Sequence, residues 1–152
     1  VIPGGTGYHL KELEPYKLPL ASRNIILVKG YEHHLGRGLN IVKALQAIQD
    51  KIQNYEVVVF GAHPVVIEYI QSHQLGFKVF DRNGLSHQKI LELMGKSLIY
   101  IGNSISDGMP NTLLEAIVMG VFPIQSNPGG VTEEIIKDGV NGLLINNPES
   151  IP

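Results

Sequence analysis

The sequence predicts a doubly wound α/β domain, with a parallel sheet of about six strands and helices on both faces. Three observations support this prediction. Short apolar runs rich in β-branched residues recur along the chain, stretches with helical periodicity separate them, and the connections are short. Alternation of this kind is typical of βαβ units, whose parallel sheets are covered on both faces.

The order of the elements follows from the apolar pattern. The first 24 residues contain Pro and Gly and no periodic pattern, so we expect a linker there and the α/β domain at residues 25–152. Helices are expected between the strands, and the first has an apolar face formed by Ile41, Leu45, Ile48 and Ile52. The third has one formed by Ile90, Leu91 and Met94. The strands are expected at residues 25–29, 57–60, 78–80, 98–101, 122–124 and 143–145.

The composition indicates a globular domain and argues against several kinds of partner and site. The 152 residues are 43% apolar, and no apolar run approaches the roughly 20 residues that span a bilayer. Fourteen acidic and 12 basic residues, without a basic stripe, argue against nucleic acid as a partner. The absence of cysteine excludes disulfides and a thiolate nucleophile, and is compatible with a cytoplasmic location. The six histidines show no metal-binding pattern and are expected to face solvent.

The chain starts with VIPGGTG, without an initiator Met, which suggests a piece of a longer protein. Its ligand-binding residues are expected in the loops that follow the strands, because doubly wound sheets bind ligands there. In SDGMPNTLLEAIVMG, Pro110 suits the first helical position, and Gly108 would let a ligand approach the backbone. An ordinary helix cap, satisfied by water or Asp107, explains the pattern equally well. The N–H groups that would bind a phosphate at this helix start belong to Asn111, Thr112 and Leu113.

Glu115 is the only charged residue from Gly108 through Thr132. A carboxylate in so apolar a helix either reaches solvent or accepts hydrogen bonds from a ligand. Its two oxygens suit a pair of neighbouring hydroxyls, such as those of a ribose. Asp107, outside the helix, would reach the other side of the same ligand. The two acids together predict a sugar-binding site.

A second glycine-containing segment, SNPGGVTEEI, follows the fifth strand and is expected to begin a short helix at about Val131. Gly129 and Gly130 would form a loop that approaches the ligand closely, with Glu133 turned towards it. The structural explanation is that acidic residues in a first helical turn complement the helix dipole.

These motifs resemble those of a known family. SDGMPNTLLEA followed by SNPGGVTEEIIKDGVNGLLI is similar to the nucleotide-sugar-binding half of the retaining glycosyltransferases of family 4, also called glycosyl transferases group 1. VIPGG resembles the family's interdomain linker, and Gly61 its glycine turn after the second strand. The resemblance implies a Rossmann-like lobe of a two-lobed GT-B enzyme, without the N-terminal acceptor lobe.

The resemblance also implies roles for individual residues. Glu115 would hold the ribose hydroxyls, Asp107 the transferred sugar, and the amides of residues 111–113 the phosphates. The Gly129-Gly130 loop would lie against the donor. Asp107 stands where the family usually has Glu, which leaves the donor sugar open.

A larger departure from the family follows the first strand. The family usually shows Gly-Arg and then Lys-Gly, whose cations clamp the diphosphate, whereas this chain reads KGYEHHLGRG. Tyr31 stands at the Arg position, so Arg37 is the expected diphosphate cation and Lys29 the expected second charge. From the residues alone, Lys29 can instead end a strand in solvent and Arg37 can simply begin a helix.

By resemblance, the full enzyme would transfer a hexose-type sugar from a nucleoside diphosphate sugar to an acceptor hydroxyl, with retention and without a metal or other cofactor. Fixed donors at Arg37 and Lys29 would stabilise the charge that grows on the diphosphate. The implied partners are the nucleotide sugar and the acceptor lobe, with peripheral membrane contact through that lobe. Polysaccharide biosynthesis is the implied process, and the chain alone is expected to bind donor without turnover.

Two alternative functions stay open, and a third is disfavoured. A nucleotide-sugar epimerase of the same fold would share the ribose carboxylate. A degenerate lobe that serves as a binding or regulatory module would explain why Tyr31 replaces the expected Arg. A nicotinamide dehydrogenase requires GxGxxG after the first strand, and the Gly36-Arg37-Gly38 segment lacks the third Gly.

Overall fold

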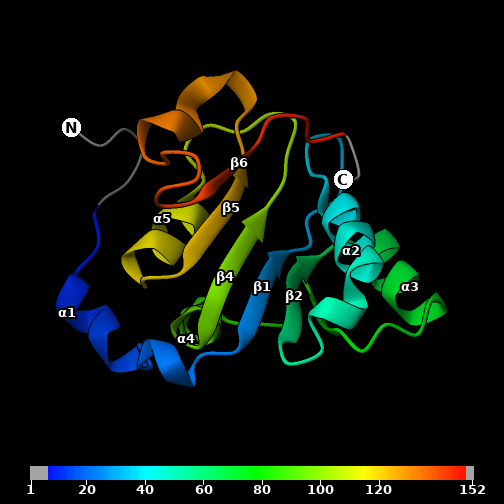
Figure 1. Ribbon diagram of the computed structural model, residues 1–152, viewed down its shortest axis with the longest axis horizontal. Helices are drawn as coiled ribbons and strands as arrows, with labels where there is room; N and C mark the ends of the chain where they lie inside the picture. Colours follow the sequence, from blue (N-terminus) through cyan, green and yellow to red (C-terminus); the bar gives the residue numbers. More distant parts are fainter. Residues whose placement is uncertain (1–6, 150–152) are drawn as a thin grey trace.

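The computed structural model describes residues 7–149 and consists of one parallel sheet with helices on both faces (Figure 1). The sheet has six strands in the order β3-β2-β1-β4-β5-β6, and neighbouring strands run parallel. Each strand contains one of the predicted apolar runs, so the predicted fold class is confirmed. The strands are β1 (Ile25–Lys29), β2 (Glu56–Ala62), β3 (Lys78–Asp81), β4 (Ser97–Gly102), β5 (Phe122–Ser126) and β6 (Leu143–Ile145).

Successive residues of a strand point to opposite faces of the sheet, and each face packs against its own helices. Leu27 of β1 belongs to the core under α4 and α5, whereas Val28 belongs to the core under α2 and α3. Both residues are fully buried, as a parallel sheet covered on two faces requires. In α4, Leu91 and Met94 are buried as predicted. The helices are α2 (Gly38–Ala47), α3 (Pro64–Ser72), α4 (His87–Gly95) and α5 (Asn111–Val118).

The helix after β1 is shorter than its apolar pattern predicted. Ile41 and Leu45 are buried as expected, but α2 ends before Ile48, which is 40% exposed. The N–H of Ile48 donates to the carbonyl of Leu45, three residues earlier, which tightens the last turn. A 3₁₀ helix, η3 (Gln49–Lys51), follows, so Ile52 does not continue the apolar face of α2.

The predicted linker contains short helical segments that pack against the sheet domain. Leu13 is buried in the core under α4 and α5. The Arg23 guanidinium fastens the segment, because it donates to backbone carbonyls at the start of β4 and at the end of α5. The VIPGG motif lies outside the described residues, and a linker function between two lobes stays a prediction. The segments are α1 (Leu10–Leu13), η1 (Glu14–Tyr16) and η2 (Leu20–Ser22).

Candidate functional site

A cavity of about 230 Å³ lies at the carboxyl ends of β1, β4 and β5 and is the candidate site. The strand order reverses between β1 and β4, which is where doubly wound sheets bind their ligands. The sequence therefore predicted the correct edge of the sheet for a cavity. The lining residues are Lys29, Tyr31, Leu35, Asn103, Ser104, Ser106, Asp107 and Gln125.

Two of the predicted site residues meet at this cavity. Lys29 ends β1, and Asp107 lies in the loop between β4 and α5. Within residues 7–149, no hydrogen bond or ion pair engages the Lys29 ammonium or the Asp107 carboxylate. The cavity thus offers one cation and one carboxylate, both available to a ligand that carries negative charge and hydroxyl groups.

Two further cavity residues were not predicted from the sequence. Asn103 follows β4 directly and Gln125 lies within β5; they are 8% and 2% exposed. Each has a buried side-chain oxygen without a hydrogen-bond partner among the described residues. Their place at strand ends is a weak signal on its own, because Asn and Gln are common near loops.

Gly102 makes room for the Gln125 side chain. A Cβ at Gly102 would overlap the Gln125 amide oxygen and would lie 2.7 Å from the Tyr100 hydroxyl. Burial raises the pKa of Tyr100, so this hydroxyl stays protonated and remains a possible donor. Only glycine fits at this position without displacing its neighbours.

Glu115 is 8% exposed and does not line the cavity. Its Oε1 lies 2.7 Å from Nε2 of His87, which begins α4. Tyr8 is also nearby: burial and the Glu115 charge both raise its pKa. The prediction that the histidines face solvent is incomplete, because the largely exposed His87 also binds this carboxylate. Glu115 is therefore partnered within the protein, unlike Lys29 and Asp107.

The start of α5 differs from the prediction in one respect. Pro110 is the N-cap rather than the first helical residue, and its carbonyl accepts from the N–H of Leu113 at 3.0 Å. The Leu113 amide is thus not free to bind a phosphate. In the described part of the chain, no acceptor engages the N–H groups of Asn111 and Thr112, so these two stay candidates. No atom lies within 4 Å of a Cβ built on Gly108, which leaves open space beside the helix start.

The segment after β5 forms a 3₁₀ helix, η4 (Pro128–Glu134), which begins earlier than the helix predicted at Val131. Gly129 and Gly130 have φ values of 73° and 79°, a conformation that favours glycine. The Glu133 carboxylate accepts a hydrogen bond from the Asn127 side chain. Glu133 therefore fastens the start of this turn.

Gly61 lies near the end of β2 with a φ of 60° and open space around its Cα. Like Gly129 and Gly130, it satisfies the backbone requirement of a glycine turn. None of these three glycines lines the cavity, so their predicted contact with a ligand stays a prediction.

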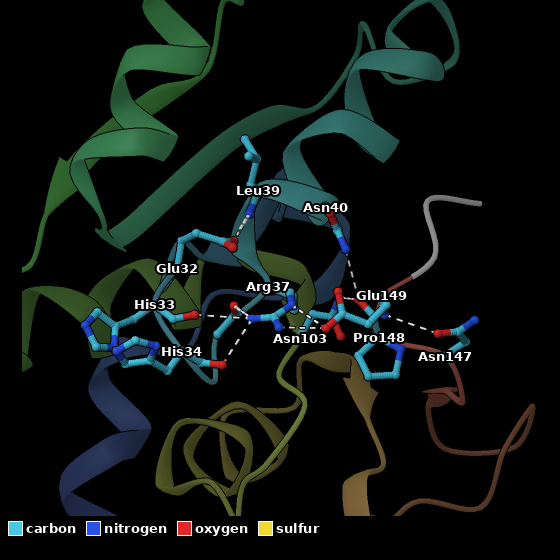
Figure 2. Close-up of polar contacts among 11 residues, drawn as sticks. Glu32, His33, His34, Arg37, Leu39, Asn40, Asn103, Asn147, Pro148 and Glu149 are labelled. Carbon is cyan, nitrogen blue, oxygen red and sulfur yellow. Dashed lines mark hydrogen bonds and ion pairs between the residues drawn. The ribbon is translucent and has the colours of Figure 1, made fainter.

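Arg37, the predicted diphosphate cation, is bound within the protein (Figure 2). Its Nε and Nη2 lie 2.8 and 2.6 Å from Oε1 of Glu149, and Nη1 donates to the carbonyls of His33 and Gly36. The hydrogen bond to Glu149 raises the pKa of Arg37. Arg37 does not line the cavity. It ties the loop after β1 to the segment after β6.

The same segment after β6 is held at a second point (Figure 2). The carbonyl of Pro148 accepts from the side-chain amides of Asn40, in α2, and Asn103. Residues 147–149, which we call the tail, therefore contact α2, the loop after β1 and the residue that follows β4. The tail and Arg37 therefore lie near the ends of β1 and β4, although neither lines the cavity.

A larger cavity of about 540 Å³ lies between α2 and the sheet. Isoleucines dominate it, including Ile26, Ile99 and Ile124, and none of its described lining residues is charged. It therefore lacks a cation for a diphosphate, and its polar lining consists of the asparagines Asn40, Asn103, Asn146 and Asn147. Residues 7–149 contain no group of three or more His, Cys, Asp or Glu placed to hold a metal ion. No helix in that range is long and apolar enough to cross a membrane.

The family model described as glycosyl transferases group 1 matches residues 14–151. A search of curated proteins found no significant match. Among solved structures, the chain is similar to the C-terminal domain of a glycosyl transferase group 1 family protein, LpcC, from Francisella tularensis. That comparison has a TM-score of 0.69 and 19% identity, and covers 95% of this chain and 77% of the other.

Two longer proteins share the fold. A glycosyltransferase from Rickettsia africae has a TM-score of 0.64 and 24% identity, over 96% of this chain and 40% of the other. Anabaena Alr3699/HepE, solved in complex with UDP and glucose, has a TM-score of 0.57 and 17% identity, over 90% of this chain and 38% of the other. The chain thus spans less than half the length of both proteins.

Proposed function

The chain belongs to the glycosyl transferases group 1 family, and we propose that it is the nucleotide-sugar-binding half of a retaining, GT-B-type hexosyltransferase. The observation that supports this function is the cavity at the β1 and β4 ends, which holds an unpaired ammonium and an unpaired carboxylate. A sugar diphosphate presents phosphate oxygens and hydroxyl groups side by side, and so requires both kinds of partner.

In this proposal Lys29 is the main cation for the diphosphate. As the bond between sugar and phosphate breaks, negative charge grows on the leaving diphosphate, and fixed donors near that charge lower the barrier. The Lys29 ammonium and the free N–H groups of Asn111 and Thr112 are the donors available. Asp107 would accept a hydroxyl of the transferred sugar.

For Arg37 we propose a role other than the predicted binding of the diphosphate. Its guanidinium already binds the Glu149 carboxylate and three carbonyls, so a phosphate would have to compete with them. Arg37 would instead hold the loop after β1 and the tail in the arrangement that forms the cavity. With Arg37 reassigned, Lys29 is the single cation among the described residues that line the cavity.

Glu115 would bind the ribose hydroxyls, as in the family. Its oxygen Oε1 is held by His87, so ribose binding requires that His87 move away or that the hydroxyls use the second oxygen. The largely exposed His87 side chain can move at little cost in packing. The acceptor lobe, a cytoplasmic location, membrane contact and a part in polysaccharide biosynthesis also belong to the proposal for the whole protein.

Calorimetric titration with UDP, GDP and ADP, without added metal, tests this function. The Anabaena neighbour was solved with UDP, which makes UDP the first ligand to try. The chain is expected to bind one nucleotide, and Lys29→Met is expected to weaken that binding by about 10- to 100-fold, as for a lost charge-assisted hydrogen bond. The control is Lys51→Met, which removes an exposed lysine in η3.

Binding that is unchanged in Lys29→Met would contradict the assignment of the diphosphate to this cavity. Absence of binding for all three nucleotides would favour the degenerate module over a donor lobe. A nucleotide-sugar epimerase would also bind a nucleotide. Release of the nucleoside diphosphate by the full-length enzyme only when an acceptor is present distinguishes the transferase from it.

A further inference from the structure

The cavity is lined by two buried side-chain amides, those of Asn103 and Gln125. The oxygen of each amide is buried and, among the described residues, has no hydrogen-bond partner. A buried acceptor without a partner is unfavourable, so such groups in a native structure require an explanation.

The hydrogen bonds of the two amide nitrogens determine which atom is left over. The Asn103 Nδ2 donates to the carbonyl of Pro148 at 2.9 Å, and a carbonyl can only accept. The Gln125 Nε2 donates to Oγ of Ser126, which also accepts from the N–H of Ser104. The unused atoms are therefore the oxygens. A ligand that satisfies them must bring hydrogen-bond donors.

The fold also keeps space for one of these amides. Gly102 lies beside the Gln125 oxygen, and any larger residue would overlap it. Glycine within a strand weakens that strand, and often marks a place where another group approaches closely. The Gln125 side chain is thus accommodated by a neighbour of the smallest possible size.

We propose that Gln125, together with Asn103, is a specificity-determining residue that accepts hydrogen bonds from hydroxyl groups of the transferred sugar. This inference rests on the proposed function. Asp107 supplies a further acceptor at the same cavity, and within residues 7–149 Lys29 is the single cation that lines it. Such a set favours a neutral sugar rich in hydroxyl groups and disfavours a sugar acid, whose carboxylate would face Asp107 and the two amide oxygens.

The test compares each nucleoside diphosphate with its sugar: UDP with UDP-glucose, GDP with GDP-mannose, and ADP with ADP-glucose. The wild-type chain is expected to bind one nucleotide sugar more tightly than the matching diphosphate. Gln125→Met keeps the side-chain volume and removes the acceptor, so this preference should fall by about tenfold while diphosphate affinity stays the same. Gln71→Met, at an exposed position of α3, is the control and should change neither affinity.

The melting temperature separates this role from a structural one. Gln125→Met removes an unsatisfied buried acceptor together with the 3.3 Å hydrogen bond from Nε2 to Ser126, so the melting temperature should change little or rise. A lower melting temperature, with both affinities reduced equally, would overturn the inference. If Gln125→Met does not fold, Asn103→Leu provides the same comparison.

Two other outcomes have distinct meanings. A wild-type chain that binds a diphosphate but shows no preference for its sugar in any pair, or a Gln125→Met variant that keeps the full preference, would overturn the role of Gln125 alone. A wild-type chain that binds none of the six ligands would overturn the proposed function itself.

Discussion

Lys29 and Glu115 carry opposite charges but are held differently by the protein. Lys29 lines the cavity and has no ion-pair partner in the described chain, whereas Glu115 is buried and bound to His87. An anion can therefore bind Lys29 without displacing a protein group. A ligand at Glu115 has to share the carboxylate with His87 or replace it. Lys29 is for this reason the better first target for mutation.

Gly102 is expected to be essential for the packing around the Gln125 side chain. In Gly102→Ala the new Cβ would overlap the Gln125 amide, so the free energy of unfolding should fall by about 1–3 kcal/mol. Denaturant unfolding measures this change. Gly76→Ala is the matched control, because no atom lies within 4 Å of a Cβ built there. Equal stability of the two variants would show that Gln125 moves freely and would contradict the packing described.

Sequence reasoning identified some of the residues at the cavity and missed others. Lys29 at a strand end and Asp107 before a helix start were predicted, and both lie at the cavity. Asn103 and Gln125 were missed, since their oxygens are seen to lack partners among the described residues only in the folded structure. The contact between His87 and Glu115 was also missed, because the two residues lie in different helices and 28 positions apart in the sequence.

Among the elements, the tail is fastened by a contact that depends on pH, because it involves the Glu149 carboxylate. The hydrogen bond from Arg37 lowers the pKa of Glu149. A carboxyl with a lowered folded-state pKa stabilises the structure above its unfolded pKa, about 4.3 for Glu, and loses that contribution as the pH falls through the folded value. The contact between the tail and the loop after β1 should therefore be intact at neutral pH and lost in acid.

The Arg37 Nε–H signal in NMR measures this contact. Its chemical shift is expected to lie downfield at neutral pH, where Nε–H donates to the Glu149 carboxylate, and to move towards the value of a free guanidinium as the pH falls and Glu149 becomes protonated. Glu149→Gln should show weak pH dependence throughout, whereas Glu134→Gln, at an exposed site in η4, should behave like the wild type. A downfield Nε–H shift at neutral pH that persists in Glu149→Gln would contradict the role of this ion pair.

The strands could be predicted more reliably than the helix ends. The central strands β1, β2 and β4 are largely buried and contain long apolar runs, whereas the partly exposed edge strand β3 contains a shorter one, and all six runs were found in the sequence. The end of α2 at Ala47 and the N-cap at Pro110 depend on local backbone geometry that periodicity does not report. The ion pair between Arg37 and Glu149 spans 112 positions, which no local pattern can show.

At the scale of the whole molecule, the chain is one α/β unit with its charged cavity at the point where the strand order reverses. It spans 40% of the Rickettsia glycosyltransferase and 38% of the Anabaena protein. Under the proposed function, this unit supplies the parts that bind the donor. The parts that bind an acceptor are expected in the other lobe, and donor binding without transfer is the activity predicted for the chain alone.

The most direct test of the proposed site is an NMR titration with the nucleotide that binds this chain, which maps the binding site on the assigned backbone amides. Titration is expected to shift the amides of Lys29, Asp107, Asn111 and Thr112, which surround the cavity and the start of α5. Shifts confined to Ile26, Ile99 and Ile124 in the apolar cavity, or the absence of any shift at Lys29 and Asp107, would contradict the assignment of the sugar-nucleotide site.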